Sequence, residues 1–301
     1  MNTQTDHQAN KKTKEGLVFA LLAYCIWGIS PIFFKLLEAI NTYEIIAQRA
    51  IWSLMFLVLL ITFTHSWGNI KTICTRPKTL AVLFLTSILI GCNWTIYIWA
   101  INHGHMLDAS LGYFISPLSS ILLAFIFLKE RFRLRQWCAI LLVILGITIQ
   151  LWRFGTIPLV GLGVAFSFSF YGLARKKIGV DAQSGLFFET LLLMPVAIIY
   201  LLFFTHTPHN AIIGYPLNTQ LLLITAGAVT TIPLLFFNAA AIRMKLSTLG
   251  LIQYVSPTLV FSLAIFMYHE PINMDILITF CFIWVALLIF IVDSFIHERR
   301  G

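Results

Sequence analysis

Charge is scarce in this sequence. Only 11% of the 301 residues are Asp, Glu, Lys or Arg, whereas 59% are hydrophobic and the mean hydropathy is +0.89. A soluble globular domain is about a quarter charged, so this composition excludes an ordinary soluble protein and indicates a chain that lies in a lipid bilayer. The formal net charge is +8, but the basic residues occupy short gaps between apolar runs, which argues against nucleic acid as a partner.

Cysteine pairs and catalytic motifs are also lacking. The five cysteines are an odd number without C-x-x-C spacing, so we expect no disulfide framework, no metal site and no other cofactor. The stretch NHGHMLD (102–108) is too short to complete a metal site. No G-x-x-x-x-G-K-[ST] motif or soluble domain occurs, which excludes a primary pump. We find no nucleophile–base pair at membrane depth, so the chain is not expected to be an enzyme.

Long apolar runs dominate instead. A membrane-spanning helix needs about 20 mostly apolar residues, and in lipid such runs must be helical because every backbone polar group has to be paired internally. The sequence therefore predicts an all-α polytopic membrane protein with ten spans and two polar tails, 1–16 and 295–301. The expected spans are 17–37, 44–64, 79–101, 109–128, 136–152, 157–174, 184–204, 219–242, 247–267 and 273–294.

The distribution of basic residues gives the orientation of these spans. Lys and Arg are enriched in cytoplasmic loops. Most of the 20 Lys and Arg residues lie in the two tails and in every second gap, on one side of the membrane. We therefore expect both termini to be cytoplasmic, which agrees with an even number of spans.

Two segments of the chain resemble each other. ISPLSSILLAFIFLKERFRLR (115–135) and VSPTLVFSLAIFMYHEPINMD (255–275) align at an offset of 140 residues. The same offset lays the first five spans over the last five. Because five is odd, the second copy crosses the membrane in the opposite direction, so its end lies outside and lacks the arginines that follow the first. The sequence predicts two inverted repeats, 17–152 and 157–294.

Inverted repeats are a common plan of secondary transporters, with the substrate site near the middle of the membrane where the halves meet. A duplicated scaffold without transport is the alternative. Pro117 and Pro257 should kink their helices and open a cavity between them. Polar and aromatic residues at span depth are candidates for substrate contacts: Trp27, Asn93, Trp94, Tyr97, Tyr113, Tyr171, Asn238, Gln253 and Tyr254. Buried amides also bridge membrane helices without touching a ligand.

Two ionisable residues lie within spans, where charge is costly and usually functional. Arg49 is five residues into its helix from the outside, and Glu189 about five from the inside. Each is therefore about 7–8 Å deep and they differ in depth by about 15 Å, so a direct ion pair is not expected. We interpret them as gating or coupling residues. Arg49 could hold a substrate carboxylate, and Glu189 could pair with a cation such as Arg175 or carry a coupling proton.

Several stretches together resemble a known family. WGISPIFFK (27–35), NWTIYIWAINHGHMLDASLGYFISPL (93–118), FSFYGLARKK (168–177) and STLGLIQYVSPTLVF (247–261) are similar to the RarD, or chloramphenicol-sensitive protein, family. One departure is Ser116 in ISPL, where the family pattern has INPL. The resemblance implies a ten-helix carrier of the bacterial inner membrane, in the drug/metabolite transporter superfamily, with two EamA repeats and a cavity lined mainly by spans one, three, four, six, eight and nine.

Two functions remain open at this point. The first is a secondary transporter that moves a small organic metabolite, such as an amino acid or a related compound, and that exports it. The second is a drug efflux protein for chloramphenicol-like amphiphilic compounds, because an aromatic and weakly charged cavity suits such ligands. The lipid bilayer and a small-molecule substrate are the expected partners, and the substrate, the direction, the coupling ion and the oligomeric state stay open.

Overall fold

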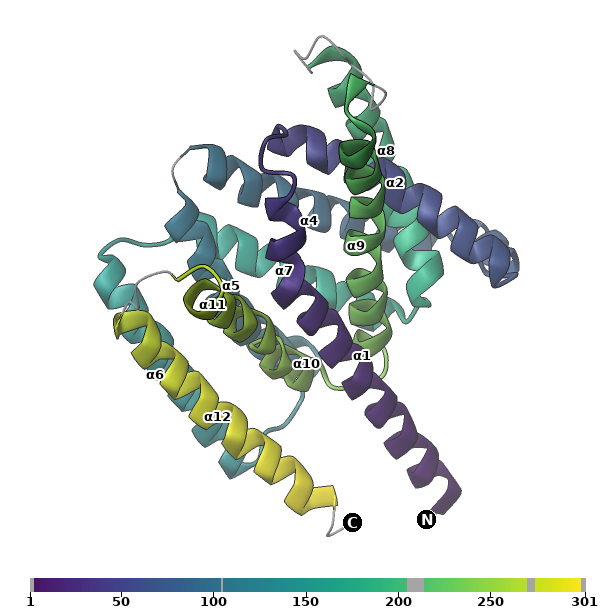
Figure 1. The fold of residues 1–301 in the computed structure, drawn as a ribbon. Helices are drawn as coiled ribbons and strands as arrows, with labels where there is room; N and C mark the ends of the chain where they lie inside the picture. Colours follow the sequence, from purple (N-terminus) through teal and green to yellow (C-terminus); the bar gives the residue numbers. More distant parts are fainter. Residues whose placement is uncertain (1–2, 104, 205–213, 270–273, 299–301) are drawn as a thin grey trace.

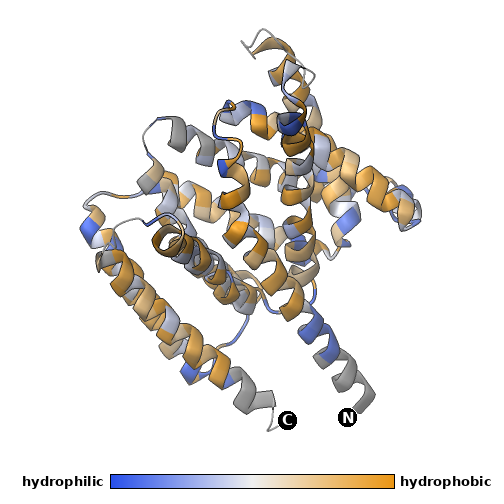
Figure 2. Ribbon diagram, viewed as in Figure 1, coloured by the Kyte–Doolittle hydropathy of each residue, from blue (hydrophilic) through white to orange (hydrophobic). Residues whose placement is uncertain are grey.

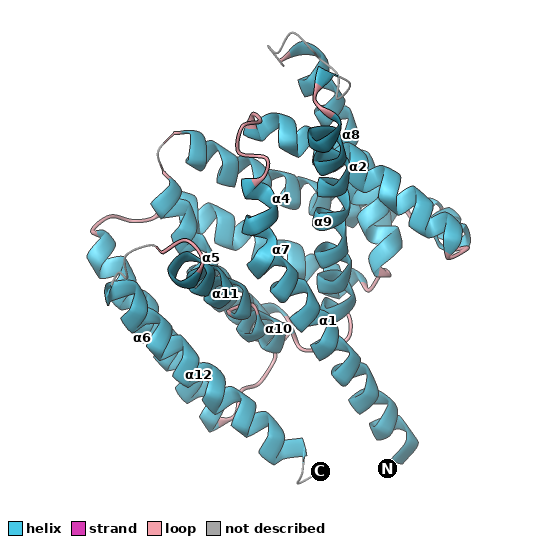
Figure 3. Ribbon diagram, in the orientation of Figure 1, coloured by secondary structure: helices cyan, strands magenta, loops and turns pink. Residues whose placement is uncertain are grey.

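The computed structural model describes residues 3–103, 105–204, 214–269 and 274–298, and over these residues the chain is helical with no strand (Figures 1 and 3). The expected all-α class is confirmed. The helices are α1 (Thr3–Lys35), α2 (Thr42–Phe63), α3 (Trp67–Cys74), α4 (Pro77–Asn102), α5 (Met106–Phe127), α6 (Leu134–Phe154), α7 (Leu159–Ile178), α8 (Ala182–Phe203), α9 (Leu217–Ala241), α10 (Leu246–Ile252), α11 (Val255–Phe266) and α12 (Met274–Glu298).

Nine helical segments in the described part of the chain are long and apolar enough to cross a membrane. α10 and α11 form one of these segments, Leu246–Phe266. α7 is not among the nine. Its last turn carries Arg175, Lys176 and Lys177, which lower its mean hydropathy. Figure 2 shows hydrophobic residues along most of each helix, with a hydrophilic stretch near the start of α1.

The expected spans and the observed helices follow the same order but differ in three places. α1 begins at Thr3, so most of the expected polar tail 1–16 continues the first helix. α3 is a short helix in an expected gap. The expected span 247–267 is interrupted at Gln253 and Tyr254. Pro257 explains the interruption, because it has no N–H to donate to the Gln253 carbonyl. That carbonyl accepts instead from the Ser256 N–H at 3.1 Å.

The two segments that contain Pro117 and Pro257 differ in whether the helix is continuous and agree in the backbone conformation just after it. Pro117 lies inside a continuous α5, so the expected kink does not interrupt this helix. Shortly after α5, Lys129 has a φ of 53°, and shortly after α11, His269 has a φ of 54°. A positive φ is uncommon for residues other than glycine. These two residues are separated by the 140 positions that relate the similar segments of sequence.

The same contacts between helices are found when each of the first five expected spans is replaced by its counterpart among the last five, and the reverse. α1 packs on α9 as α7 packs on α4, and α1 packs on α11 as α7 packs on α5. Likewise α2 packs on α9 as α8 packs on α4, whereas α6 and α12 pack on each other, side by side at one edge of Figure 1. The first turn of α1 and the last turn of α12 lie at the same end of that view.

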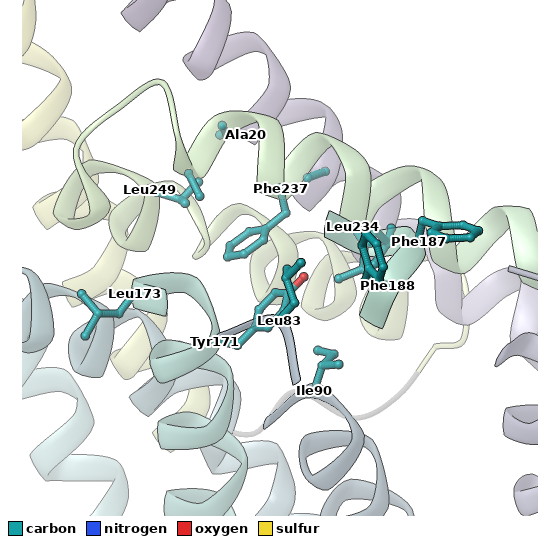
Figure 4. Close-up of a cluster of buried hydrophobic side chains, with 14 of the residues drawn as sticks. Ala20, Leu83, Ile90, Tyr171, Leu173, Phe187, Phe188, Leu234, Phe237 and Leu249 are labelled. Atoms are coloured by element: carbon teal, nitrogen blue, oxygen red, sulfur yellow. The ribbon is translucent and has the colours of Figure 1, made fainter. Parts of the chain in front are cut away.

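A large buried cluster joins helices from both halves of the chain. Figure 4 shows part of it, with labelled side chains from six helices, α1, α4, α7, α8, α9 and α10: Ala20, Leu83, Ile90, Tyr171, Leu173, Phe187, Phe188, Leu234, Phe237 and Leu249. The rings of Tyr171 and Phe237 stack with centroids 6.0 Å apart. Lipid is as apolar as these side chains, so close packing rather than exclusion of water holds the helices together. Apolar side chains on the outer surface, such as Phe63 and Val196, would face hydrocarbon.

Candidate functional site

Arg49, in α2, lies among aromatic rings from three other helices. Its guanidinium carbon is 5.0 Å from the ring centroid of Phe34 in α1 and 5.3 Å from that of Trp94 in α4. Tyr97 of α4 and Tyr113 of α5 interact with the guanidinium electrostatically. Aromatic ring faces attract cations, so this group, which we name the Arg49 cluster, holds a positive charge inside the helix bundle.

The hydrogen bonds of Arg49 are incomplete. Its Nε donates to Thr230 Oγ1 in α9 at 2.7 Å, and that hydroxyl donates in turn to the Ala226 carbonyl at 2.8 Å. No carboxylate of the described residues lies within 4.0 Å of the guanidinium. Arg49 is partly exposed, and Tyr113 is 42% exposed although its ring packs edge-on to Tyr97 with centroids 5.6 Å apart. An incompletely bonded charge at a partly open position can bind a ligand.

A second charged group lies fully inside the protein. The Nε of Arg175 in α7 is 3.7 Å from Glu189 Oε1 in α8, and both side chains are 0% exposed. Glu189 accepts from Thr86 Oγ1 at 2.6 Å and from the Tyr171 hydroxyl at 3.0 Å. The side-chain oxygen of Asn238, Oδ1, accepts from Arg175 Nε at 3.0 Å. Its side-chain nitrogen, Nδ2, donates to the Tyr171 hydroxyl at 2.7 Å. We name these five residues the Arg175 network.

Local structure explains how a basic residue near a helix end reaches the interior. The guanidinium of Arg175 lies beside the start of α8, where its Nη2 donates to the Asp181 carbonyl at 3.3 Å and its Nε lies near Glu189. α7 ends at Gly179, which has a φ of 63°, and α8 begins where the Asp181 carboxylate accepts from Ser184 N at 2.9 Å. Gly185 then leaves room for the guanidinium, because a Cβ built there would overlap Arg175 Nη1. Arg175 was counted with the cytoplasmic loop residues in the sequence; its side chain instead lies buried.

Arg49 and Glu189 do not contact each other, since each has partners of its own. Glu189 pairs with Arg175, one of the two roles considered from the sequence, while the coupling-proton role stays a prediction. Thr86 and Thr230 were not predicted. Under the offset of 140 residues, Thr86 corresponds to Ala226 and Thr230 to Ile90, so the similarity of the two halves gave no signal for either threonine. Phe34 had no signal in the sequence either.

Two candidate residues, Gln253 and Tyr254, form polar contacts between α5 and the break between α10 and α11. Gln253 Nε2 donates to Ser116 Oγ at 3.0 Å, and the Tyr254 hydroxyl donates to the Phe114 carbonyl at 2.8 Å. The Ser116 carbonyl accepts from Ser169 Oγ at 3.0 Å. Tyr254 is 0% exposed. These polar atoms connect helices, and a role of Gln253 and Tyr254 in substrate contact stays a prediction.

Trp27 and Asn93 also contact other helices. The Trp27 ring lies 5.8 Å from that of Phe168 and 5.9 Å from that of Phe237, centroid to centroid. Asn93 Nδ2 donates to the Val164 carbonyl at 2.8 Å and to Ser167 Oγ at 3.0 Å, which joins α4 to α7. Of the residues predicted to contact substrate, the structure therefore brings Trp94, Tyr97 and Tyr113 together around Arg49 and distributes the others among helix contacts.

A surface groove lies between α4 and α8. It is lined by Leu80, Ala81, Leu83, Phe84, Phe188, Leu191 and Leu192. It has no polar side chain to orient a ligand, as small-molecule sites normally do, and its lining suits lipid chains. Within the described ranges, no group of three or more His, Cys, Asp or Glu residues could hold a metal ion.

Comparison with known proteins places the chain among transporters. The model of the EamA-like transporter family matches residues 14–152. Protein RarD of Escherichia coli (strain K12) is 50% identical over 290 residues, which are 96% of this chain and 98% of the relative. An uncharacterized transporter of Vibrio cholerae is 49% identical over 281 residues, 93% of each chain. A crystal structure of a protein with 15% sequence identity superposes with a TM-score of 0.72, over 91% of this chain and 96% of the other chain. At this identity the likeness shows the fold alone.

The apolar helices and the EamA match define a class, the multi-pass membrane transporters. The near-complete coverage at 50% identity then gives the family. The chain belongs to the RarD family of the drug/metabolite transporter superfamily.

Proposed function

We propose that this protein is a secondary transporter that exports a small organic metabolite, amino-acid-like or related, across the bacterial inner membrane by alternating access. The observation that carries the proposal is the Arg49 cluster. It combines a charged donor with incomplete hydrogen bonds and apolar rings from α1, α4 and α5. Ligand sites are mostly apolar with a few polar groups that fix orientation. Membership in a family of transporters also fits a protein that is not an enzyme.

Alternating access needs two halves that can rearrange, and we propose that α7 is a tenth span and that the halves are inverted repeats, 17–152 and 157–294. Two observations support this. Helix contacts recur when the halves are exchanged, as for α1 on α9 and α7 on α4. The positive φ values of Lys129 and His269 recur at the sequence offset. Both termini would then lie in the cytoplasm, with the basic gaps.

The break between α10 and α11 is a candidate hinge. It leaves Gln253 and Tyr254 between two short helices that pack on α5 and α1, respectively. Hinges are a few residues at element ends that absorb backbone changes. Pro257 removes one hydrogen bond beside the break, and the helix is interrupted there, so the second half can bend at a point where α5 continues past Pro117.

Glu189 is the residue that could couple transport to a proton by carrying it. Its carboxylate lies in a network with Arg175, Thr86 and Tyr171. A Glu189→Gln variant that keeps transport driven by a pH gradient would exclude that role. Loss of gradient-driven transport with retained exchange would support it.

Drug efflux is the second candidate function. One relative, at 30% identity, bears the name chloramphenicol-sensitive protein RarD, and the aromatic rings around Arg49 would accept amphiphilic compounds. The two functions differ in breadth. A metabolite carrier selects one chemical class, whereas an efflux protein accepts many unrelated ones.

The test is a ligand screen followed by transport. Purified protein in detergent is melted with amino acids, nucleosides, vitamins and antibiotics including chloramphenicol, because a ligand of the folded state raises its melting temperature. Ligands that stabilise it are then assayed for counterflow in proteoliposomes. We expect one metabolite class to stabilise the protein and to exchange, with loss in Tyr113→Ala and retention in the surface control Trp152→Ala. Stabilisation by many unrelated drugs would favour efflux, and no saturable flux of any ligand would contradict both.

A further inference from the structure

Arg49 and Glu189 occupy corresponding positions of the two repeats and carry opposite charges. They are separated by the offset of 140 residues. Each hydrogen-bonds a threonine on the corresponding neighbour helix: Arg49 donates to Thr230 of α9, and Glu189 accepts from Thr86 of α4. One chain therefore contains two versions of one arrangement. In each, a charged residue on the second span of one repeat contacts a threonine on the third span of the other repeat.

Only one of the two charges is neutralised by the protein. Glu189 has Arg175 at 3.7 Å and accepts two hydroxyl hydrogen bonds, with no exposure. Arg49 has a single hydrogen bond among the described residues, from Nε to Thr230, and it is partly exposed. Charge inside a membrane is normally paired. Of the two residues, the cation Arg49 is the one that has no charged partner among the described residues.

The rings near Arg49 stabilise its charge without neutralising it. Phe34 and Trp94 lie at 5.0 and 5.3 Å, where ring quadrupoles attract a guanidinium. They leave the planar edge of Nη1 and Nη2 without a hydrogen bond to any described residue. That edge matches the two oxygens of a carboxylate, which a guanidinium binds bidentately.

The charge balance selects among anions. One guanidinium in a region of low dielectric is neutralised by one negative charge, whereas a phosphate dianion would leave an excess charge there. The rings of Trp94, Tyr97 and Tyr113 beside it favour an apolar or planar body. A compact monocarboxylate with such a body satisfies both conditions.

We infer that Arg49 is the anion anchor of the transport site and that the substrate is a small carboxylate with an apolar body. This inference rests on the proposed transport function and names its substrate class. Glu189, its counterpart, is closed to substrate because Arg175 occupies it. The chain therefore uses one of its two corresponding positions for the ligand and closes the other to it.

The first arm of the test needs no variant. Full-length protein in detergent is melted with L-phenylalanine, L-leucine and phenylacetate, each compared with its amide, which keeps the body and loses the carboxylate, at about 10 mM. Phenyl phosphate is the dianion probe. We expect at least one carboxylate to raise the melting temperature and its amide not to do so. Equal shifts from acid and amide, a larger shift from phenyl phosphate, or no shift from any carboxylate would overturn the inference.

The second arm uses variants. Arg49→Gln should weaken binding of the stabilising carboxylate by about tenfold or more, because a charge-assisted hydrogen bond is lost. Arg49→Lys keeps the charge without the planar fork and should bind with intermediate affinity. Arg153→Gln, at an exposed position of α6, is the matched control and should bind as the unmodified protein does. Each variant is first checked for a single elution peak, so that a folding defect is recognised.

The outcomes separate this inference from the transport function. Saturable counterflow of a neutral compound that is unchanged in Arg49→Gln would keep the transporter and discard the anion anchor. Affinity for the carboxylate that is equal in Arg49→Gln, Arg49→Lys and Arg153→Gln would also discard it. Loss of binding in Arg49→Gln with partial retention in Arg49→Lys would support it.

Discussion

The guanidinium of Arg175 lies 3.7 Å from the carboxylate of Glu189, with both side chains fully buried. The two residues come from α7 and α8, adjacent helices of the second half of the chain. The attraction between the two charges offsets part of the cost of burying each of them. Hydrogen bonds from Thr86 and Tyr171 satisfy more of the carboxylate. This pair fixes how α4, α7, α8 and α9 meet in the core.

Breaking this pair should destabilise the protein strongly. Glu189→Gln leaves the Arg175 charge buried and unpaired, which costs about 3–5 kcal/mol. The double variant Arg175→Met/Glu189→Leu should recover much of that loss, since no unpaired charge remains. Unfolding of the purified protein in detergent measures both effects. The control is Glu15→Gln, whose partner Arg243 lies at 3.7 Å at the surface and whose loss should cost about 0–1 kcal/mol. A Glu189→Gln loss no larger than the control's would contradict this assignment.

Gly185 should not tolerate alanine. A Cβ at this position would overlap the guanidinium of Arg175 and force it away from Glu189. Gly185→Ala should therefore lower the melting temperature although alanine is the better helix former by about 1 kcal/mol. Gly68→Ala is the matched control, because nothing lies within 4 Å of a Cβ there. It should be neutral or stabilising. Equal melting temperatures of the two variants would show that Arg175 can be displaced at little cost.

Glu130 should stabilise the start of α10. Its carboxylate accepts from the backbone N–H groups of Leu246 at 2.9 Å and Ser247 at 3.2 Å, and from the Ser247 hydroxyl. An acidic group that caps a helix N-terminus contributes about 1 kcal/mol. Glu130→Ala should lower the free energy of unfolding by that amount, and with it the melting temperature, and should loosen the contact between the halves. Glu38→Ala, at an exposed position, is the comparison variant, and an equal effect of both would argue against a specific cap.

The orientation of the termini can be tested with reporter fusions. Alkaline phosphatase folds only outside the cytoplasm, and green fluorescent protein exported unfolded does not fluoresce there. We expect phosphatase activity from a fusion after Ile157 and none from a fusion after Gly179, with the reverse for fluorescence, because the last turn of α7 carries three basic residues and the last turn of α6 carries one. A fluorescent protein at the C-terminus should fluoresce. Active phosphatase after Gly179 would exclude the expected topology and the inverted arrangement that depends on it.

Sequence patterns predicted the individual helices well. The span 44–64 lies in α2 (Thr42–Phe63) except for its last residue, and the span 136–152 lies within α6 (Leu134–Phe154). Apolar length alone decides such elements in lipid, because no other backbone arrangement pairs its own polar groups. The sequence predicted a kink at both Pro117 and Pro257, but not that the chain would be interrupted at Gln253 while α5 stays continuous. Proline removes a hydrogen bond in both α5 and α11, and only packing decides whether the helix continues past it.

The functional residues divide in the same way. Composition and periodicity identified Arg49 and Glu189, because charge inside an apolar run is visible without a structure. They did not show that Glu189 is neutralised by Arg175 while Arg49 is left with one threonine and several aromatic rings. Those partners come from residues 14 to 181 positions away in the chain.

The sequence by itself determined the membrane class, the order of the helices, the expected sidedness and the family, since each depends on composition, local periodicity or matching residues. The tertiary structure decided which charges are paired, which polar side chains connect helices and which cluster around Arg49. The physical reason is that the side-by-side arrangement of helices in lipid depends on shape and small contact energies between their faces. Two helices with the same apolar pattern and one charged residue each can therefore differ in the structure. One charged residue is paired by the protein, as Glu189 is, and the other is left open to a ligand, as Arg49 is.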